Sequence, residues 1–239
     1  MKDNVTYYNE FSAGYEARRH GGYHRFLDDL QASLVRERLT GAEDVLEVGC
    51  GTGLIMSRLS DSAASVTGVD ISPGMLEHAK TRGLDVHEAS VTDLPFEDSC
   101  FDLVYSFKVL AHVQEIGTAM EECLRVTRPG GTALLEFYNP TSWRGVRKRV
   151  VVDRISGDTR ESEVYTRYDT LSGARGVLEA AGWSYAGHRG VIIFTPFAQM
   201  HLVPGVGHLL RAGERLASRT PLGRLGGFLT VFGTKGSTV

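Results

Sequence analysis

A glycine-rich loop at residues 45–53 carries the clearest chemical signal in the chain. The apolar run Val45-Leu46-Glu47-Val48 is followed by glycines at three alternate positions, Gly49, Gly51 and Gly53. Glycine adopts positive φ without strain, and its missing Cβ lets backbone N–H groups approach a ligand closely. A glycine turn that opens onto a helix also presents partial positive charge and N–H donors to an anion. The loop therefore predicts a site for a nucleotide-like cofactor.

A carboxylate follows the loop at a distance that suits a ribose. Asp70 ends the predicted strand 65–70, about 20 residues beyond the glycines, where a carboxylate can bind a ribose diol. A dinucleotide fingerprint requires G-x-G-x-x-G, and Leu54 stands where the third glycine belongs. This mismatch disfavours a nicotinamide-dependent oxidoreductase, which we keep as an alternative.

The elements that position these residues alternate along the chain, a pattern typical of a parallel sheet with helices on both faces. We expect strands at 45–48, 65–70, 85–89, 101–107, 132–137, 191–194 and 228–233. We expect helices at 54–60, 73–82, 113–126, 171–181 and 209–217, preceded by a helix bearing Tyr8, Phe11 and Tyr15 and a second one over 26–39. The pattern predicts an α/β fold.

Composition narrows the class of protein. The chain has 239 residues, of which 42% are apolar and 23% charged, as in ordinary globular domains. Its net charge of -3 gives no argument for nucleic-acid binding. Cys50, Cys100 and Cys123 are widely spaced and lack zinc-ligand spacing, so we expect a reducing cytoplasm and neither a disulfide framework nor a metal. The uncharged stretch 190–210 contains prolines and glycines that fit a membrane span poorly.

Five motifs in register resemble the class I S-adenosylmethionine (SAM)-dependent methyltransferase family, in its small-molecule, UbiE-like (type 11) branch. Together they cover residues 45–137 approximately, and they are Val45–Gly53, Gly68-Val69-Asp70-Ile71-Ser72, Asp93-Leu94-Pro95-Phe96, Phe101-Asp102-Leu103-Val104 and Leu124–Gly131. The resemblance implies a Rossmann-like, seven-stranded, mostly parallel sheet with helices on both faces and an antiparallel last strand. It also implies SAM as cofactor and S-adenosylhomocysteine (SAH) as product.

The resemblance further implies roles in cofactor binding. Asp70 would accept hydrogen bonds from both ribose hydroxyls, a bidentate role that suits a carboxylate. The family usually has an aspartate for the adenine amino group where this chain has Ser90, so Val91 N–H and Asp93 would share that task. The remaining residues of the implied cofactor site are Tyr15, Arg19, Glu47, Gly49, Cys50, Gly51, Gly53, Ile71, Met75 and Phe107.

The N-terminal helix admits two interpretations. By the resemblance, Tyr15, Arg18, Arg19 and His20 fold over SAM, with an arginine on the methionine carboxylate and a tyrosine at the methyl group. Alternatively, Tyr8, Phe11 and Tyr15 form a core stripe and the arginines a solvated face.

Methyl transfer from a sulfonium requires alignment and at most one general base. His112 follows the fourth predicted strand, where ligands sit in open α/β sheets, and is the candidate base; alternatively it packs the next helix. The candidate acceptor residues are Tyr8, Glu136, Tyr138 and Asn139. The basic cluster Arg144, Arg147, Lys148, Arg149 and Arg154 suits an acidic acceptor, an anionic membrane or simply a solvated face.

We therefore expect one cytoplasmic methyltransferase domain acting on an O, N or C nucleophile of a small, hydrophobic or aromatic acceptor. Its parts would be a helical cap (1–40), a SAM-binding core (41–138), an insertion over the acceptor (139–168) and the rest of the sheet (169–239). A non-catalytic SAM-binding regulator is a second alternative. We expect no nucleic-acid partner and no transmembrane segment, with peripheral membrane contact left open.

Overall fold

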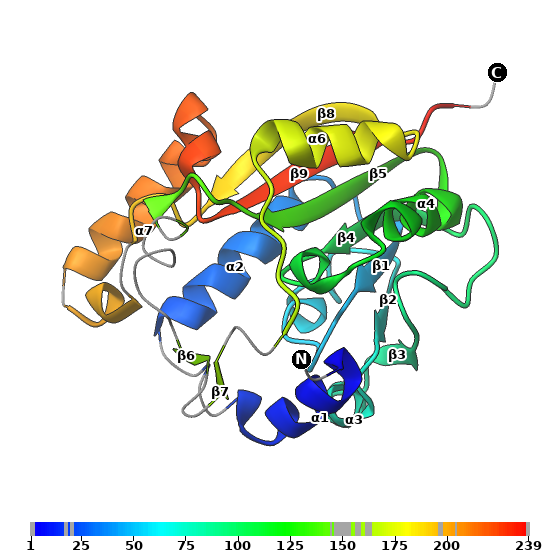
Figure 1. Ribbon diagram of the computed structural model, residues 1–239, viewed down its shortest axis with the longest axis horizontal. Coiled ribbons are helices and arrows are strands. Elements are labelled where there is room, and N and C mark those ends of the chain that lie inside the picture. Colours follow the sequence, from blue (N-terminus) through cyan, green and yellow to red (C-terminus); the bar gives the residue numbers. More distant parts are fainter. Residues whose placement is uncertain are drawn as a thin grey trace.

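The computed structural model describes residues 3–16, 19, 22–143, 145, 154–155, 159–160, 164–195, 198–203 and 205–237. Its centre is a seven-stranded sheet with the order β3-β2-β1-β4-β5-β9-β8 (Figure 1). The strands of this sheet are β1 (Asp44–Val48), β2 (Ser65–Asp70), β3 (Asp85–Glu88), β4 (Phe101–Ser106), β5 (Thr127–Tyr138), β8 (Ser184–Val191) and β9 (Phe228–Thr234). A small pair, β6 (Arg154–Ile155) and β7 (Thr159–Arg160), lies apart from it.

Helices cover this sheet on both faces. They are α1 (Asn4–Tyr15), α2 (Gly22–Arg36), α3 (Pro73–Thr81), α4 (Ile116–Val126), α6 (Leu171–Ala180) and α7 (Val206–Ala217), joined by short 3₁₀ turns η1 (Met56–Arg58), η2 (Leu110–His112), η4 (Ala198–Leu202) and η5 (Pro221–Leu225). Among the described residues, no helix is both long and apolar enough to cross a membrane.

Strand direction confirms the predicted topology. Strands β3, β2, β1, β4 and β5 pair in parallel, and β9 runs antiparallel between β5 and β8. The fold is therefore a Rossmann-like, mostly parallel sheet whose last strand is antiparallel. Because parallel strands end at the same edge, the carboxyl ends of β1, β2 and β4 meet there, which is where open α/β sheets bind ligands.

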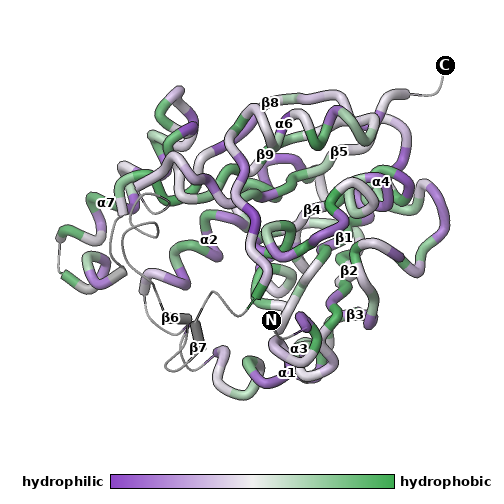
Figure 2. The backbone as a smooth tube through the Cα atoms, viewed as in Figure 1, coloured by the Kyte–Doolittle hydropathy of each residue, from purple (hydrophilic) through white to green (hydrophobic). Residues whose placement is uncertain are grey.

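Alternate residues of the central strands build the core on opposite faces, as the period of two requires. Leu46 and Val104 pack with α4 and α6, whereas Val45 and Leu103 pack with α2. Apolar colouring runs along β5 and β9 in the middle of the molecule (Figure 2). The two buried layers hold the strand ends rigidly, so that the loops at the carboxyl edge are positioned by the core.

The segment expected to be a helix at 54–60 is instead a turn with the short η1, and that prediction was wrong. The reason lies in a competing side chain: the Arg58 guanidinium donates to the Leu54 carbonyl, the acceptor that an α-helix would offer to Arg58 N–H. That N–H bonds the Ile55 carbonyl at 2.9 Å, which is the tighter 3₁₀ pattern.

The strand expected at 191–194 was also misplaced. Strand β8 ends at Val191, and Ile192 has φ of 61°, so the chain turns away from the sheet. The next two N–H groups, of Ile193 and Phe194, donate to the Glu214 carboxylate at 2.6 and 2.8 Å. The true strand begins at Ser184 and contains Gly187, His188, Arg189 and Gly190, a composition without apolar alternation, which an edge strand tolerates.

Candidate functional site

The glycine loop turns sharply at the carboxyl end of β1. Gly49, Gly51 and Gly53 all have positive φ, at 75°, 54° and 76°. A Cβ at Gly49 would lie 2.1 Å from Val109 Cγ2, and one at Gly53 would lie 2.2 Å from Leu84 Cδ1. A Cβ at Gly51 would meet no atom within 4 Å. Two glycines thus allow the loop to pack on the protein, while the middle one borders open space where a ligand can approach.

A cavity of about 530 Å³ lies over this loop, within the size range of small-molecule sites. It extends from the glycine loop and the end of β2 to α1, η2 and the segment before α6. Of the predicted residues it is lined by Tyr8, Tyr15, Arg19, Glu47, Gly49, Cys50, Gly51, Asp70, Ile71, Met75, Ser90, Val91, Phe107 and His112. The predicted residues Gly53, Glu136, Tyr138 and Asn139 are not among its described lining.

Asp70 is held at the edge of the cavity by two backbone donors. Gly51 N–H donates to its Oδ2 at 2.8 Å, and Ser72 N–H donates to its Oδ1 at 2.9 Å. Burial raises the pKa of the Asp70 carboxyl, and these backbone bonds oppose that shift. Each oxygen keeps a second lone pair, so the carboxylate can still accept from the hydroxyls of a ribose.

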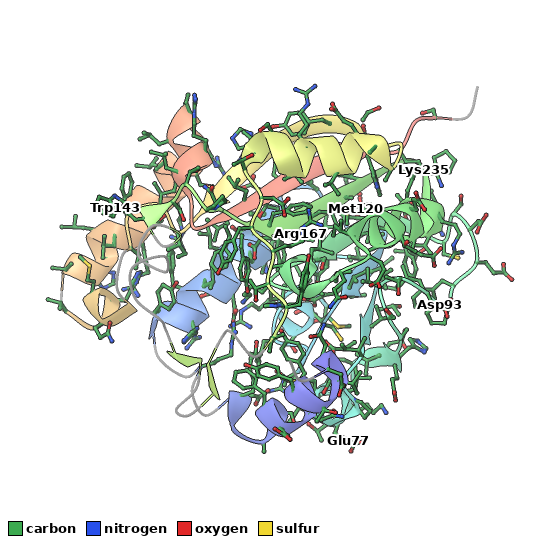
Figure 3. The ribbon with its side chains drawn as sticks, viewed as in Figure 1. Glu77, Asp93, Met120, Trp143, Arg167 and Lys235 are labelled. Atoms are coloured by element: carbon green, nitrogen blue, oxygen red, sulfur yellow. The ribbon has the colours of Figure 1, made fainter. Side chains whose placement is uncertain are left out.

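The adenine side of the predicted site is formed by the loop after β3. The Ser90 hydroxyl bonds Thr92 Oγ1 at 2.7 Å, and Asp93 N–H donates to the Ser90 carbonyl at 3.1 Å. These bonds order the segment that brings Ser90 and the buried Val91 to the cavity. Asp93 itself is not among the described lining residues, and Figure 3 shows it at the periphery beyond β3.

Arg125 fixes the next part of that loop, a role that the sequence did not reveal. Its guanidinium donates to the Leu94 carbonyl at 3.0 Å and to the Phe96 carbonyl at 2.7 Å, and it forms two bonds to Glu122. Hydrogen bonds to Glu122 and Asp98 raise the pKa of Arg125. A single arginine on α4 thus anchors the Leu-Pro-Phe segment beside the cofactor site.

Glu47 lies on β1 just before the glycine loop and is almost completely buried. Tyr105 Oη donates to its Oε2 at 2.9 Å. Burial raises the pKa of Glu47 to about 8, an effect that the Tyr105 bond and the nearby Lys108 ammonium partly oppose.

A charged array closes one end of the cavity, and it unites residues far apart in the sequence. Buried Asp28 on α2 pairs with Arg19 and accepts from Lys108 Nζ at 3.3 Å. Burial lowers the pKa of Lys108 to about 8, with the Arg19 charge acting in the same direction. Arg19 Nε is buried and has no hydrogen-bond partner in the described part of the chain. Arg19 and Lys108 both line this end of the cavity, against the one carboxylate of Asp28. This excess of positive charge suits an anionic ligand group such as a carboxylate.

The sequence contexts of Lys108 and Asp28 are unusual, but neither context alone indicates that the two residues form an ion pair. Lys108 follows the apolar strand β4 directly and has φ of 62°, a strained conformation for a residue with a side chain. Asp28 interrupts the apolar face of α2. Each is a charge in an apolar context, and only the tertiary structure pairs them.

His112 is oriented by a carbonyl group. Its Nδ1 lies 2.9 Å from the Tyr165 carbonyl oxygen, which can only accept, so Nδ1 carries the proton. In the neutral ring, Nε2 is then the basic nitrogen, and it lies 3.5 Å from Tyr138 Oη. The His112 ring also contacts Tyr8 edge to face, at 6.1 Å between centroids. The structure therefore brings His112, Tyr8 and Tyr138 together.

Two of the residues predicted to bind the acceptor, Glu136 and Asn139, make hydrogen bonds within the protein. Glu136 is fully buried and accepts from Gln31 Nε2 at 2.7 Å and from Lys108 N–H at 3.2 Å. Asn139 donates to the carbonyls of Arg224 and Gly226 at 2.9 and 2.8 Å, joining the end of β5 to η5. Both are at the carboxyl edge of the sheet, as expected, but their polar atoms are engaged within the protein.

Several predicted residues lie outside the described residues: Arg18, His20, Arg144, Arg147, Lys148 and Arg149, together with the side chain of Arg154. The insertion is described only in part. Tyr165, near its end, reaches both the cavity and His112.

The described residues fit SAM at each of its parts. The open side of Gly51 and the Asp70 carboxylate suit the ribose, Ile71 and Met75 suit the adenine face, and Arg19 suits the methionine carboxylate. A parallel sheet with a glycine turn and an acidic strand end at its carboxyl edge defines the class of Rossmann-like nucleotide-cofactor proteins.

Comparison with known proteins identifies the family within that class. Residues 46–135 match the methyltransferase-domain family. A demethylmenaquinone methyltransferase of Beutenbergia cavernae is 31% identical over 199 residues, which cover 76% of this chain and 78% of that protein. A probable SAM-dependent methyltransferase of Mycolicibacterium smegmatis is 30% identical over 150 residues, and the match spans 62% of this chain and only 54% of that protein.

The fold agrees with a SAM-dependent methyltransferase from Thermotoga maritima, with a TM-score of 0.70 at 20% identity, covering 97% of this chain and 99% of that one. The chain belongs to the class I SAM-dependent methyltransferase family, whose cofactor is SAM.

Proposed function

We propose that this chain transfers a methyl group from SAM to an O, N or C nucleophile of a small, apolar or aromatic organic acceptor. One observation carries the proposal: a single cavity joins the glycine loop and Asp70 to His112 and Tyr8. The cofactor end and a candidate base therefore share one cavity, which is what an in-line displacement requires.

Individual residues of this chain would have separate roles in binding SAM and shaping the site. Asp70 would hold the ribose, and Arg19 the methionine carboxylate. SAM supplies an electrophilic methyl group on its sulfonium. The buried Glu47 and Tyr105 would keep the glycine loop in shape, and the cap formed by α1 would exclude water from the reacting atoms.

His112 would act as the general base. The Nδ1–H bond to the Tyr165 carbonyl fixes the ring and leaves Nε2 as the proton acceptor. Tyr138 Oη, 3.5 Å from Nε2, would position the ring or pass the proton on. This arrangement supports a base role better than simple helix packing, because His112 is one of the residues that line the cavity.

The aromatic character of the far end supports an apolar or aromatic acceptor. Tyr8, Val113 and Tyr165 line it next to His112. Burial raises the pKa of Tyr8 well above its usual range, so its hydroxyl stays protonated and can donate to an acceptor oxygen. The Beutenbergia relative is named for a quinone-type substrate, which agrees with this class.

The test is SAH production with His112→Gln against wild type, using a panel of phenols, quinols and aromatic amines. We expect turnover to fall by about 10² to 10⁴, the usual contribution of a general base, with the SAH dissociation constant unchanged. His87→Gln, an exposed histidine at the sheet edge, is the matched control. Equal turnover in wild type and His112→Gln would refute the base role. Binding of SAM without SAH production from any acceptor would favour a non-catalytic regulator.

A further inference from the structure

Helix α7 is attached to the domain through a charged residue. Its buried positions include Gly207, Glu214 and Ala217. The Glu214 carboxylate accepts from Ile193 N–H at 2.6 Å, and its other oxygen accepts from Thr195 Oγ1 at 2.9 Å. An amphipathic helix at the surface of a protein usually buries its apolar side. In α7 the inward side is instead the one that carries Glu214.

Two of the three leucines of α7 face outward, whereas Leu210 is partly buried. Leu209 and Leu216 are 77% and 72% exposed. They are seven residues apart and share one side of the helix. Phe194, 44% exposed, lies beside that side, with its Cδ2 3.6 Å from the Cβ position of Gly213. We call Phe194, Val206, Leu209 and Leu216 the outer apolar strip.

Exposed apolar residues continue around the strip. Leu222 and Leu225 of η5 are 47% and 46% exposed, and Trp143 is 76% exposed. Trp143 lies four residues after Asn139, whose amide donates to the Arg224 carbonyl of η5 at 2.9 Å. Single exposed leucines are ordinary, but several exposed apolar side chains on one helix side and on the turn that packs near it indicate an interaction surface.

The charge around the strip is positive, although the whole chain carries a net charge of -3. Between residues 205 and 225 there are four arginines, Arg211, Arg215, Arg219 and Arg224, and the one acidic residue is the buried Glu214. An apolar helix side flanked by arginines is the pattern of helices that lie in the interface of an anionic membrane.

A second cavity adjoins the strip, and its lining holds more basic than acidic residues. It has a volume of about 540 Å³, lies between α2 and the end of α7, and includes Leu216 in its lining. Its charged lining residues are Arg36, Arg58, Arg189, Arg215 and Arg219, against Asp29 and Glu37. Arg58 and Arg219 pair with Asp29 and Glu37, at 2.9 and 2.6 Å. Arg36, Arg189 and Arg215 remain as the excess of positive charge among the described lining residues, which would attract a phosphate.

We propose that the outer apolar strip and this arginine-lined cavity dock the protein on the surface of an anionic phospholipid bilayer. The leucines enter the level of the acyl chains, and a headgroup phosphate occupies the cavity. A second copy of the chain fits the surface less well, because a two-fold interface would set the flanking arginines against each other. The bilayer supplies both an apolar phase and negative charge.

The test is flotation of the full chain with vesicles of phosphatidylcholine alone or mixed with phosphatidylglycerol. We expect binding to the mixed vesicles that weakens in 0.5 M salt, roughly as screening requires. The double variant Leu209→Gln, Leu216→Gln should lower the partition coefficient about 100-fold, about tenfold for each leucine lost from the apolar phase. Arg215→Gln with Arg219→Gln should lower it about 10- to 30-fold, since each arginine near an anionic surface contributes about fivefold.

Matched controls separate docking from misfolding. Arg175→Gln removes an exposed arginine from α6 and should bind as wild type does. Leu209→Phe with Leu216→Phe keeps the strip apolar and should also bind. Melting curves report folding of every variant, and the substituted leucines are too exposed for their loss to unfold the domain.

Three results would overturn the proposal: no flotation of the wild type, equal flotation with neutral and anionic vesicles, or leucine variants that bind vesicles normally. A wild-type dimer that dissociates in the leucine variants, without flotation, would assign the strip to a second copy instead.

Discussion

The substitution Asp70→Asn probes the cofactor site with the least change in shape. Gly51 N–H and Ser72 N–H donate to opposite oxygens of this carboxylate, at 2.8 and 2.9 Å. An amide has one carbonyl oxygen, so it accepts one of these bonds and turns its NH₂ group toward the other donor. The substitution therefore disturbs the glycine loop as well as removing the charge that would receive the ribose hydroxyls.

The substitution should lower both the folding stability and the affinity for the cofactor. One backbone N–H left without an acceptor costs about 1–3 kcal/mol of folding stability. Loss of the charge-assisted bonds to a ribose costs about 1.5–3 kcal/mol of binding, which corresponds to a dissociation constant raised about 10- to 150-fold.

Isothermal titration with SAH, at a temperature where circular dichroism shows the variant to be folded, measures the binding term. Asp61→Asn, which changes an exposed loop carboxylate outside the cavity lining, is the control and should bind SAH as wild type does. If Asp70→Asn bound SAH within twofold of wild type, the ribose role of Asp70 would be refuted.

Further predictions concern the loop and its supports. Gly51→Ala should fold, with about 1–2 kcal/mol less folding stability because of its positive φ, but should bind SAH weakly. Gly49→Ala should fail to fold, because its Cβ would lie 2.1 Å from Val109 Cγ2. Thermal melting measures the folding of both variants, and titration with SAH measures their binding. The pKa of Glu47 is about 8 in the folded protein against 4.5 for an ordinary glutamate, so the folded state retains a proton that the unfolded chain releases. Chemical denaturation should therefore show stability falling by up to about 1.4 kcal/mol per pH unit from pH 5 to 8, a slope that Glu47→Gln should remove. Arg125→Gln should cost about 1–3 kcal/mol in a thermal melt, because Glu122 and the Leu94 and Phe96 carbonyls lose their donor; an unchanged melting temperature would show that this anchor contributes nothing.

The parts of the site that could be predicted from sequence are those set by local backbone chemistry. The glycine loop could be recognised in the sequence because positive φ and close packing require glycine at positions 49 and 53. Asp70 could be singled out because it ends a predicted strand about 20 residues after the glycines, and β2 begins and ends where predicted. Both features depend on residues that are close together in the sequence, so they can be recognised without the tertiary structure.

The missed parts depend on partners distant in sequence. Lys108 and Asp28 are 80 residues apart, and neither has a neighbour along the chain that indicates the pair. Asn139 lies at the expected edge, but its amide is engaged by η5, 85 residues away. The edge strand β8 escaped prediction because its glycine-rich composition lacks apolar alternation, and its pairing with β9 alone defines it.

Titration calorimetry of the wild-type chain with SAM, SAH and NAD shows whether the cavity over the glycine loop binds SAM. We expect saturable binding of SAM and SAH at one site per chain and no heat with NAD. A folded protein that binds NAD, or that binds neither SAM nor SAH, would contradict it.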